Sequence, residues 1–190
     1  MHRMPKSRET GFTLIELVVV MVIIAIIAMA ALPSYRDFFD RYRLRGAVDE
    51  AMTVIGNARV EAVKADRNVK VKFGGATNNW CIGARSAGAP TGGNPVTADA
   101  CDCSTPAQCQ VGGQQMAVVQ GKHAGVSVDT VAVEFEFNSK LGVKSPLPPS
   151  TATFTSPTSK YDVRLVVNAL GHASACVPSG KPAIPGVPSC

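Results

Sequence analysis

The stretch GFTLIEL at residues 11–17 joins a short basic leader to an apolar segment that runs over residues 12–32. Glu16 is the one charged residue within this segment. A charged side chain at the centre of a membrane helix costs about 2.5–3.5 kcal/mol on insertion scales, so its presence indicates a function. The 21 residues of the segment can span a bilayer core of about 30 Å as a helix, and they therefore predict a transmembrane helix.

Gly11, Phe12 and Glu16, together with the basic leader, resemble the class III signal of type IV prepilins and pseudopilins. In that family a dedicated inner-membrane peptidase cuts after the glycine and methylates the new amino terminus. The resemblance implies a leader at residues 1–11, cleavage between Gly11 and Phe12, and N-methylation of Phe12. It also implies that Glu16 pairs with the terminal amine of a neighbouring subunit during assembly. A cationic amine inside a helix bundle supplies the partner that a buried carboxylate needs.

The arrangement of charges also predicts the topology. An ordinary secretory signal would carry a small-residue cleavage site after its apolar region, whereas here the basic leader adjoins the apolar segment directly. Leader cations stay in the cytoplasm by the positive-inside tendency, so the rest of the chain should face the periplasm. All six cysteines follow the apolar segment, as an oxidising compartment favours. Loss of the leader lowers the net charge from +5 to +3, which by itself indicates neither nucleic acid nor anionic lipid as a partner.

Helical periodicity continues beyond the apolar segment. Residues 33–66 form an amphipathic continuation of the helix, although Pro33 should kink it by removing a hydrogen bond. Read from residue 12 to residue 66, the helix would be about 80 Å long. Two stripes recur at helical spacing: an aromatic one that we interpret as a subunit-packing surface, and an apolar one that should pack on a sheet. The first comprises Tyr35, Phe38, Phe39 and Tyr42; the second comprises Val48, Met52, Ile55 and Ala62, flanked by Ala51 and Ala58.

The remaining residues, 67–190, predict a β-sheet domain. Residues 69–73 alternate apolar and basic side chains, as a half-exposed strand does. Residues 86–115 are rich in Gly, Pro, Ala and Thr and predict a long loop stapled by cysteines. The other expected strands are residues 80–82, 116–120, 130–137, 151–155, 161–167 and 173–177. The sequence thus predicts an α+β pilin fold, with a long kinked N-terminal helix packed on a mainly antiparallel sheet.

A second resemblance concerns the C-terminal part of the chain. The helix end NARVEAVK at residues 57–64, the strand after it and Trp80 resemble the GspH/FimT group of H-type pseudopilins and fimbrial minor pilins. That group closes with a Gly-Arg-x-Arg-like strand followed by a cysteine, and residues 171–176 occupy this place here. Some members capture DNA through those arginines, but His172 and Ser174 replace them in this chain. Because phosphate contacts need clustered Lys or Arg, DNA capture is the less favoured function.

Zinc binding is a further alternative. Cys101, Cys103 and Cys109 could act as ligands with His123 and His172, but structural zinc sites commonly use a Cys-x2-4-Cys pair. The spacing is off that pattern and the compartment favours disulfides, so we expect no metal and no cofactor. The sequence also lacks a Ser-His-Asp order, a paired acid motif and a phosphate-binding glycine loop followed by a helix signal. It therefore predicts a protein that is not an enzyme.

The cysteine spacing restricts the disulfides. Cys176 and Cys190 flank a Pro- and Gly-rich tail of 13 residues and should pair, a closure worth about 3 kcal/mol in the chain-entropy model. Cys101 and Cys103 are separated by one residue and are badly placed to pair with each other. Two arrangements remain open: Cys81–Cys101 with Cys103–Cys109, or Cys81–Cys103 with Cys101–Cys109.

Together these patterns favour a minor type IV pilin. The expected partners are other pilins or pseudopilins through the N-terminal helix, the prepilin peptidase and the inner membrane. The chain would cross the inner membrane once, with its C-terminal domain in the periplasm, before it joins or primes a filament. An H-type pseudopilin of a type II secretion system and a DNA-binding minor pilin for natural transformation remain as alternatives.

Overall fold

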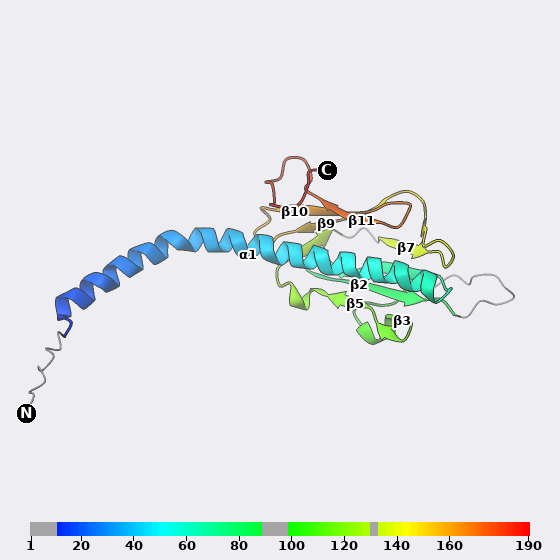
Figure 1. Ribbon diagram of the computed structural model, residues 1–190, viewed down its shortest axis with the longest axis horizontal. Coiled ribbons are helices and arrows are strands. Elements are labelled where there is room, and N and C mark those ends of the chain that lie inside the picture. Colours follow the sequence, from blue (N-terminus) through cyan, green and yellow to red (C-terminus); the bar gives the residue numbers. More distant parts are fainter. Residues whose placement is uncertain (1–10, 89–98, 130–132) are drawn as a thin grey trace, which may run out of the picture. The chain divides into compact units, whose positions relative to one another are not determined.

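The computed structural model describes residues 11–88, 99–129 and 133–190 (Figure 1). The chain divides into two compact units, residues 1–38 and 39–190. A single long helix, α1 (Leu14–Lys64), contributes to both units, and all strands lie in the second. The fold is α+β with disulfides, as the sequence predicts.

The two ends of α1 are capped by different chemistry. At the start, Thr13 accepts a hydrogen bond from the backbone N–H of Glu16 on its Oγ1 at 3.3 Å, the geometry of an N-cap. At the end, Asp66 adopts a left-handed φ of 47°. The N–H of Arg67 then reaches the Ala62 carbonyl at 3.1 Å and the N–H of Asp66 reaches the Val63 carbonyl at 3.4 Å. These two bonds form a Schellman motif, which ends the helix close to the predicted residue 66.

Apolar side chains along residues 14–29 of α1 are exposed in the isolated chain. Among the described residues, no helix is both long enough and apolar enough to cross a membrane. Pro33 lies within α1, and the kink expected there stays a prediction.

The larger sheet has five antiparallel strands in the order β5-β2-β1-β7-β8. In β1, the side chains of Val69, Val71 and Phe73 are buried and those of Lys70 and Lys72 are half-buried, which confirms the predicted alternation. The first three residues of the expected strand 130–137 lie outside the described residues. The strand bounds are β1 Val69–Ala76, β2 Asn79–Ser86, β5 Ala117–Val119, β7 Glu134–Phe137 and β8 Lys144–Ser145.

A second antiparallel sheet has the order β11-β10-β9-β6, and a small hairpin joins β3 to β4. The bounds are β6 Ser127–Asp129, β9 Ser150–Thr155, β10 Asp162–Val167, β11 Ala173–Cys176, β3 Gln110–Val111 and β4 Gln114–Gln115. Two single-turn 3-10 helices lie at Pro106–Gln108 and Gln120–Lys122. The strands β3, β4, β6 and β8 were not expected from the sequence, because two or three residues are too few to show a period.

The core of the second unit lies between α1 and the two sheets. In Figure 1 the second half of α1 runs along the domain, with β9, β10 and β11 on one side and β2 and β5 on the other. Trp80 of β2 is fully buried and packs edge-to-face on Phe154 of β9, with ring centroids 5.3 Å apart. Its Nε1 donates a hydrogen bond to the Val126 carbonyl at 3.0 Å. The predicted apolar stripe enters this core, with Val48, Ala51, Ile55, Ala58 and Ala62 buried and Met52 packed at its edge.

Candidate functional site

The N-terminal residues singled out by the sequence are exposed. Phe12 is exposed, and Glu16 projects from the first turn of α1 among exposed apolar side chains. A Cβ added to Gly11 would meet no atom within 4 Å. Nothing in the described fold therefore requires glycine at position 11, and the residue is available for a role outside the folded chain.

The aromatic stripe lies outside the core. Tyr35, Phe38, Phe39 and Tyr42 keep between 50% and 69% of their surface exposed. The second stripe of the same helix, by contrast, is buried. One helix thus carries a surface that packs its own domain and a separate surface that is open to other molecules.

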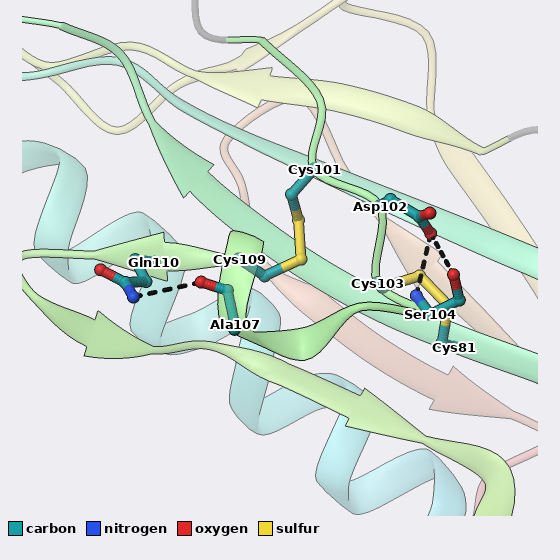
Figure 2. Close-up of a disulfide and its surroundings, with 8 residues drawn as sticks. All are labelled: Cys81, Cys101, Asp102, Cys103, Ser104, Ala107, Cys109 and Gln110. Carbon is teal, nitrogen blue, oxygen red and sulfur yellow. Dashed lines mark hydrogen bonds between the residues drawn. A yellow bond between two sulfur atoms is a disulfide. The ribbon is translucent and has the colours of Figure 1, made fainter.

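Two disulfides order the loop after β2, as Figure 2 shows: Cys81–Cys103 joins the loop to β2 of the larger sheet, and Cys101–Cys109 closes a turn within the loop. Of the two arrangements that the sequence leaves open, the structure has Cys81–Cys103 with Cys101–Cys109. All four cysteines are buried and form a small cluster of their own against Ala117 and Val119.

The segment that carries these disulfides, residues 101–110, presents polar groups on its surface. The Asp102 carboxylate accepts hydrogen bonds from the Ser104 hydroxyl at 2.5 Å and from the Ser104 backbone N–H at 3.0 Å (Figure 2). These two bonds hold the pKa of the Asp102 carboxyl below its ordinary value. The Gln110 side chain donates to the Ala107 carbonyl at 3.1 Å. The segment is therefore ordered by its disulfides and by local hydrogen bonds.

The C-terminal tail is closed by the Cys176–Cys190 disulfide, the pair expected from the sequence. Within the tail, the Val177 N–H donates to the Pro188 carbonyl at 2.8 Å, and the Cys190 N–H donates to the Val177 carbonyl at 3.0 Å. The Arg45 guanidinium of α1 donates to the Pro185 carbonyl and so ties the tail to the helix.

An open groove of about 580 Å³ lies between α1 and this tail. Its walls are largely apolar, with one basic and one acidic side chain from α1. The lining residues are Tyr42, Arg45, Gly46, Val48, Asp49, Met52, Val163, Ala175, Gly186 and Val187.

The zinc alternative fails on the chemistry of its ligands. Cys101, Cys103 and Cys109 are all in disulfides, so none can offer a thiolate. His123 Nε2 lies 3.1 Å from Glu50 Oε2, and its ring stacks on Trp80 at a centroid distance of 6.4 Å. Within the described ranges, no group of three or more His, Cys, Asp and Glu side chains could hold a metal ion.

Two cations of the domain are paired with acids on different sheets. Lys70 forms an ion pair with Glu134 at 3.1 Å on the larger sheet, and Lys181 forms one with Asp162 at 3.1 Å on the smaller sheet. His172 and Ser174, at the positions of the family's arginines, are exposed. The exposed Arg164 of β10 is paired in register with Cys176 on the neighbouring strand β11.

Lys144 is buried, although no pattern in the sequence indicates it. Its ammonium group donates to the carbonyls of Pro146 and Pro148 and to Ser150 Oγ, the last two at 2.7 and 3.2 Å. Burial lowers the pKa of this lysine. The Glu50–His123 pair was also missed, because 73 positions separate two residues that meet only when the loop after β5 folds onto α1.

Comparison with known families identifies the second unit. The family model described as type II transport protein GspH matches residues 47–171, which is more than half of the chain. The chain belongs to the GspH family. A second model, the prokaryotic N-terminal methylation motif, matches residues 6–32 of this GspH-family protein. Both resemblances noted in the sequence are thereby confirmed.

Among solved structures, the type IV minor pilin FimU of Pseudomonas aeruginosa strain PAO1 is similar to the GspH-family chain. The two sequences are 16% identical, the match covers 72% of this chain and 90% of that one, and the TM-score is 0.45. Comparison with curated proteins gave no match.

Proposed function

We propose that this GspH-family protein is a minor type IV pilin, a structural subunit without enzymatic activity that joins or primes a filament. The observation that carries the proposal is the methylation motif at residues 6–32, which coincides with the basic leader, the Gly11–Phe12 junction and the exposed apolar start of α1. In this proposal, residues 12–32 anchor the subunit in the inner membrane, with residues 67–190 in the periplasm. Assembly then transfers the same apolar helix from lipid to the filament.

Processing between Gly11 and Phe12 is the first test. Mass spectrometry of the mature chain should find a terminus at N-methylated Phe12. Gly11→Leu should leave unprocessed precursor in the membrane, although nothing in the described fold opposes the larger side chain. Gly88→Leu is the matched control, because a Cβ at Gly88 also meets open space. An intact leader in the wild type, or a cut beyond Leu32, would overturn the proposal.

The role of Glu16 is tested separately. The carboxylate lies in the first turn of α1, four residues from the proposed new terminus at Phe12. Glu16→Ala should be cleaved and inserted normally but be poorly incorporated into filaments, because the terminal amine of the neighbour loses its partner. Ile23→Ala, a change at another exposed position of the segment, is the control. Normal incorporation of Glu16→Ala would assign the acid to another role.

The family description favours a second candidate, a pseudopilin of a type II secretion system. The two candidates share their N-terminal chemistry and differ in phenotype. For a pilin, deletion of the gene should remove surface pili and leave protein secretion intact; for a pseudopilin, the reverse should hold. A DNA receptor would instead lose DNA uptake while filaments persist, and the spread of cations over both sheets argues against it.

A further inference from the structure

Strand β11 lies at one edge of the smaller sheet and pairs with β10 on its inner side. The Asn168 N–H donates to the His172 carbonyl at 3.0 Å, in the register that β10 and β11 continue. Bonded and non-bonded pairs alternate along an antiparallel ladder, so every second residue from His172 onward directs its backbone N–H and C=O towards β10. Ala173 and Ala175, which lie between these residues, direct theirs away from the sheet.

Val177 belongs to the same outward series, and the C-terminal tail supplies its partners. Its N–H donates to the Pro188 carbonyl at 2.8 Å, and its carbonyl accepts from the Cys190 N–H at 3.0 Å. The same parallel pairing, continued to Ala175, would need an N–H from Pro188, which has none. In the part of the chain that the structure describes, no backbone hydrogen bond reaches the outward groups of Ala173 or Ala175. The edge is therefore open at these two alanines.

The composition of β11 does not protect this edge. Native edge strands commonly carry a lysine, a proline or a bulge that prevents pairing with another chain. Residues 173–176 are Ala-Ser-Ala-Cys and include neither lysine nor proline, and their pairing with β10 is continuous. All four residues are exposed or half-exposed. The edge can therefore accept a further strand.

The groove between α1 and the C-terminal tail adjoins the open edge. Ala175 and Val163 form one wall of the groove, and Val48 and Met52 of α1 form another. A strand added to β11 would lie about 4.7–4.9 Å from it. Such a strand would therefore run beside this largely apolar groove.

The two alanines also fix which side chains of an added strand would enter the groove. Ala173 and Ala175 are in register with Val167 and Leu165, which are buried, so both methyl groups point to the core side of the sheet. Residues directly opposite each other on neighbouring strands share a face. The residues of an added strand that lie opposite Ala173 and Ala175 would thus point into the groove, and those between them would face solvent.

The groove also carries an acid without a counter-ion. Asp49 lines the groove and is exposed, whereas Arg45, one turn earlier on α1, donates to the Pro185 carbonyl of the tail. Among the described residues, no ion pair involves the Asp49 carboxylate. A basic side chain on the added strand would complement this charge.

We propose that the open edge of β11 binds an extended segment of a partner protein by antiparallel strand addition. The segment carries apolar side chains at alternate positions, which fill the groove, and a basic side chain beside Asp49. Its residues opposite Ala173 and Ala175 exchange N–H···O bonds with them in both directions. The inference uses residues of the second unit alone, so it does not depend on the proposed filament role.

The same strand of a second copy fits this site less well. It would bring Ala173 and Ala175 to the groove, and two methyl groups are too small to fill a volume of about 580 Å³. Residues 171–177 also contain no lysine or arginine that could meet Asp49. The size and the charge of the groove therefore favour a different extended segment.

A synthetic peptide tests the docking. The probe is fluorescein-labelled Lys-Thr-Val-Thr-Val-Thr-Val, which places its lysine and valines on one side of an extended strand. Its fluorescence anisotropy should rise and saturate as detergent-solubilised full-length chain is added. N-methylation of the valines removes the donors that face β11 and should abolish binding. N-methylation of the threonines, whose N–H groups face solvent, is the matched control and should retain it.

Variants of the chain test the two sides of the site. Ala175→Pro removes an outward N–H and leaves the ladder with β10 intact, so it should weaken peptide binding by about tenfold or more. Ala175→Ser keeps the N–H and should bind as the wild type does. Asp49→Asn should reduce the preference for the probe over its Lys-to-Gln version, which we expect to be up to about fivefold. Asp129→Asn, at an exposed acid of β6, should preserve that preference.

Hydrogen exchange of the full-length chain in micelles locates the contact. In the free chain, the amides of Ala173 and Ala175 should exchange fast and those of Ser174 and Cys176 slowly. The probe should slow exchange at the two alanines by about tenfold or more.

Each contrary result overturns the proposal. Slow exchange at both alanines in the free chain would show that the edge is already covered. Absence of saturable binding would remove the extended segment. Equal binding of the valine-methylated peptide, or unchanged binding by Ala175→Pro, would place the peptide elsewhere. Self-association that protects both alanines and excludes the probe would assign the edge to a second copy.

Discussion

At the scale of single residues, Gly83 allows two disulfides to lie side by side. A Cβ at this position would come within 2.5 Å of Cys109 Sγ and 2.8 Å of Cys101 Sγ. Both sulfurs are buried and bonded to each other, so neither can move away independently. The strand itself would accept any residue here, and the requirement for glycine comes from the packing of the cysteines alone.

Gly83→Ala should therefore overpack the site beside the Cys101–Cys109 disulfide and lower the free energy of unfolding by about 1–3 kcal/mol. Alkylation of the full-length chain followed by peptide mapping should find free thiols or mixed pairing in this variant. Gly88→Ala, where a Cβ meets open space, should retain the wild-type pairs. A Cys101–Cys103 bond in the wild type would contradict the arrangement itself.

Lys144 predicts a dependence of stability on pH. Burial lowers the pKa of this lysine in the folded chain below its ordinary value of 10.5. Between the folded and unfolded pKa values the unfolded chain binds more protons, so the free energy of unfolding contributed by this group rises with pH across that window. The wild type should thus gain stability relative to Lys144→Met as pH increases towards 10.5. Urea unfolding followed by Trp80 fluorescence measures the difference, and a flat or falling difference would contradict the lowered pKa of Lys144.

At the scale of elements, α1 combines a buried face and an exposed face in one helix. Small side chains at Ala47, Ala51, Ala58 and Ala62 are fully buried and let the sheets approach the helix closely. Ile55 supplies the larger volume between them. Because Val60 on the other face of the helix is 61% exposed, substitutions on the two faces should have different effects.

Ile55→Ala should lower the free energy of unfolding by about 2–5 kcal/mol, since it removes buried methyl groups and leaves a cavity. Val60→Ala is the matched change on the exposed face of the same helix and should cost less than about 0.5 kcal/mol. Thermal unfolding of the detergent-solubilised chain, monitored by Trp80 fluorescence, gives both values. Similar losses for the two variants would contradict the division of α1 into two faces.

At the scale of the whole molecule, disulfides stabilise segments that have little core of their own. The tail between Cys176 and Cys190 buries few side chains, of which Ile184 and Val177 are the main ones, and is tied to α1 through Arg45. The disulfide that closes this 13-residue loop stabilises the domain mainly by lowering the conformational entropy of the unfolded chain, and less by adding contacts to the folded one.

Replacing both cysteines, Cys176→Ser with Cys190→Ser, should therefore lower the stability of the domain by about 3 kcal/mol. Hydrogen exchange should also rise at the amides of Val177 and Cys190, which are hydrogen-bonded within the tail. Arg45→Gln should loosen the tail with the disulfide intact and so measures the contribution of the helix contact separately. Unchanged exchange in the double variant would show that the tail is held by other contacts.

Features that depend on neighbouring residues could be predicted from the sequence. Local periodicity predicts three features: the position of α1 and its end near residue 66, the buried stripe from Val48 to Ala62, and the alternation of β1. The family motifs at residues 6–32 and 47–171 are likewise properties of the sequence. Spacing also indicated the Cys176–Cys190 pair, because one short loop closes it.

Features that depend on residues far apart in the chain could be assigned only from the folded structure. The choice of Cys81–Cys103 over Cys81–Cys101 depends on how the loop after β2 folds back, which no local pattern encodes. The short strands β3, β4, β6 and β8 form because a neighbouring strand offers hydrogen-bonding groups, and their two or three residues carry no period of their own. Lys144 looks like a surface cation in the sequence. Its burial depends on three oxygen acceptors that converge only when the proline-rich loop closes over it.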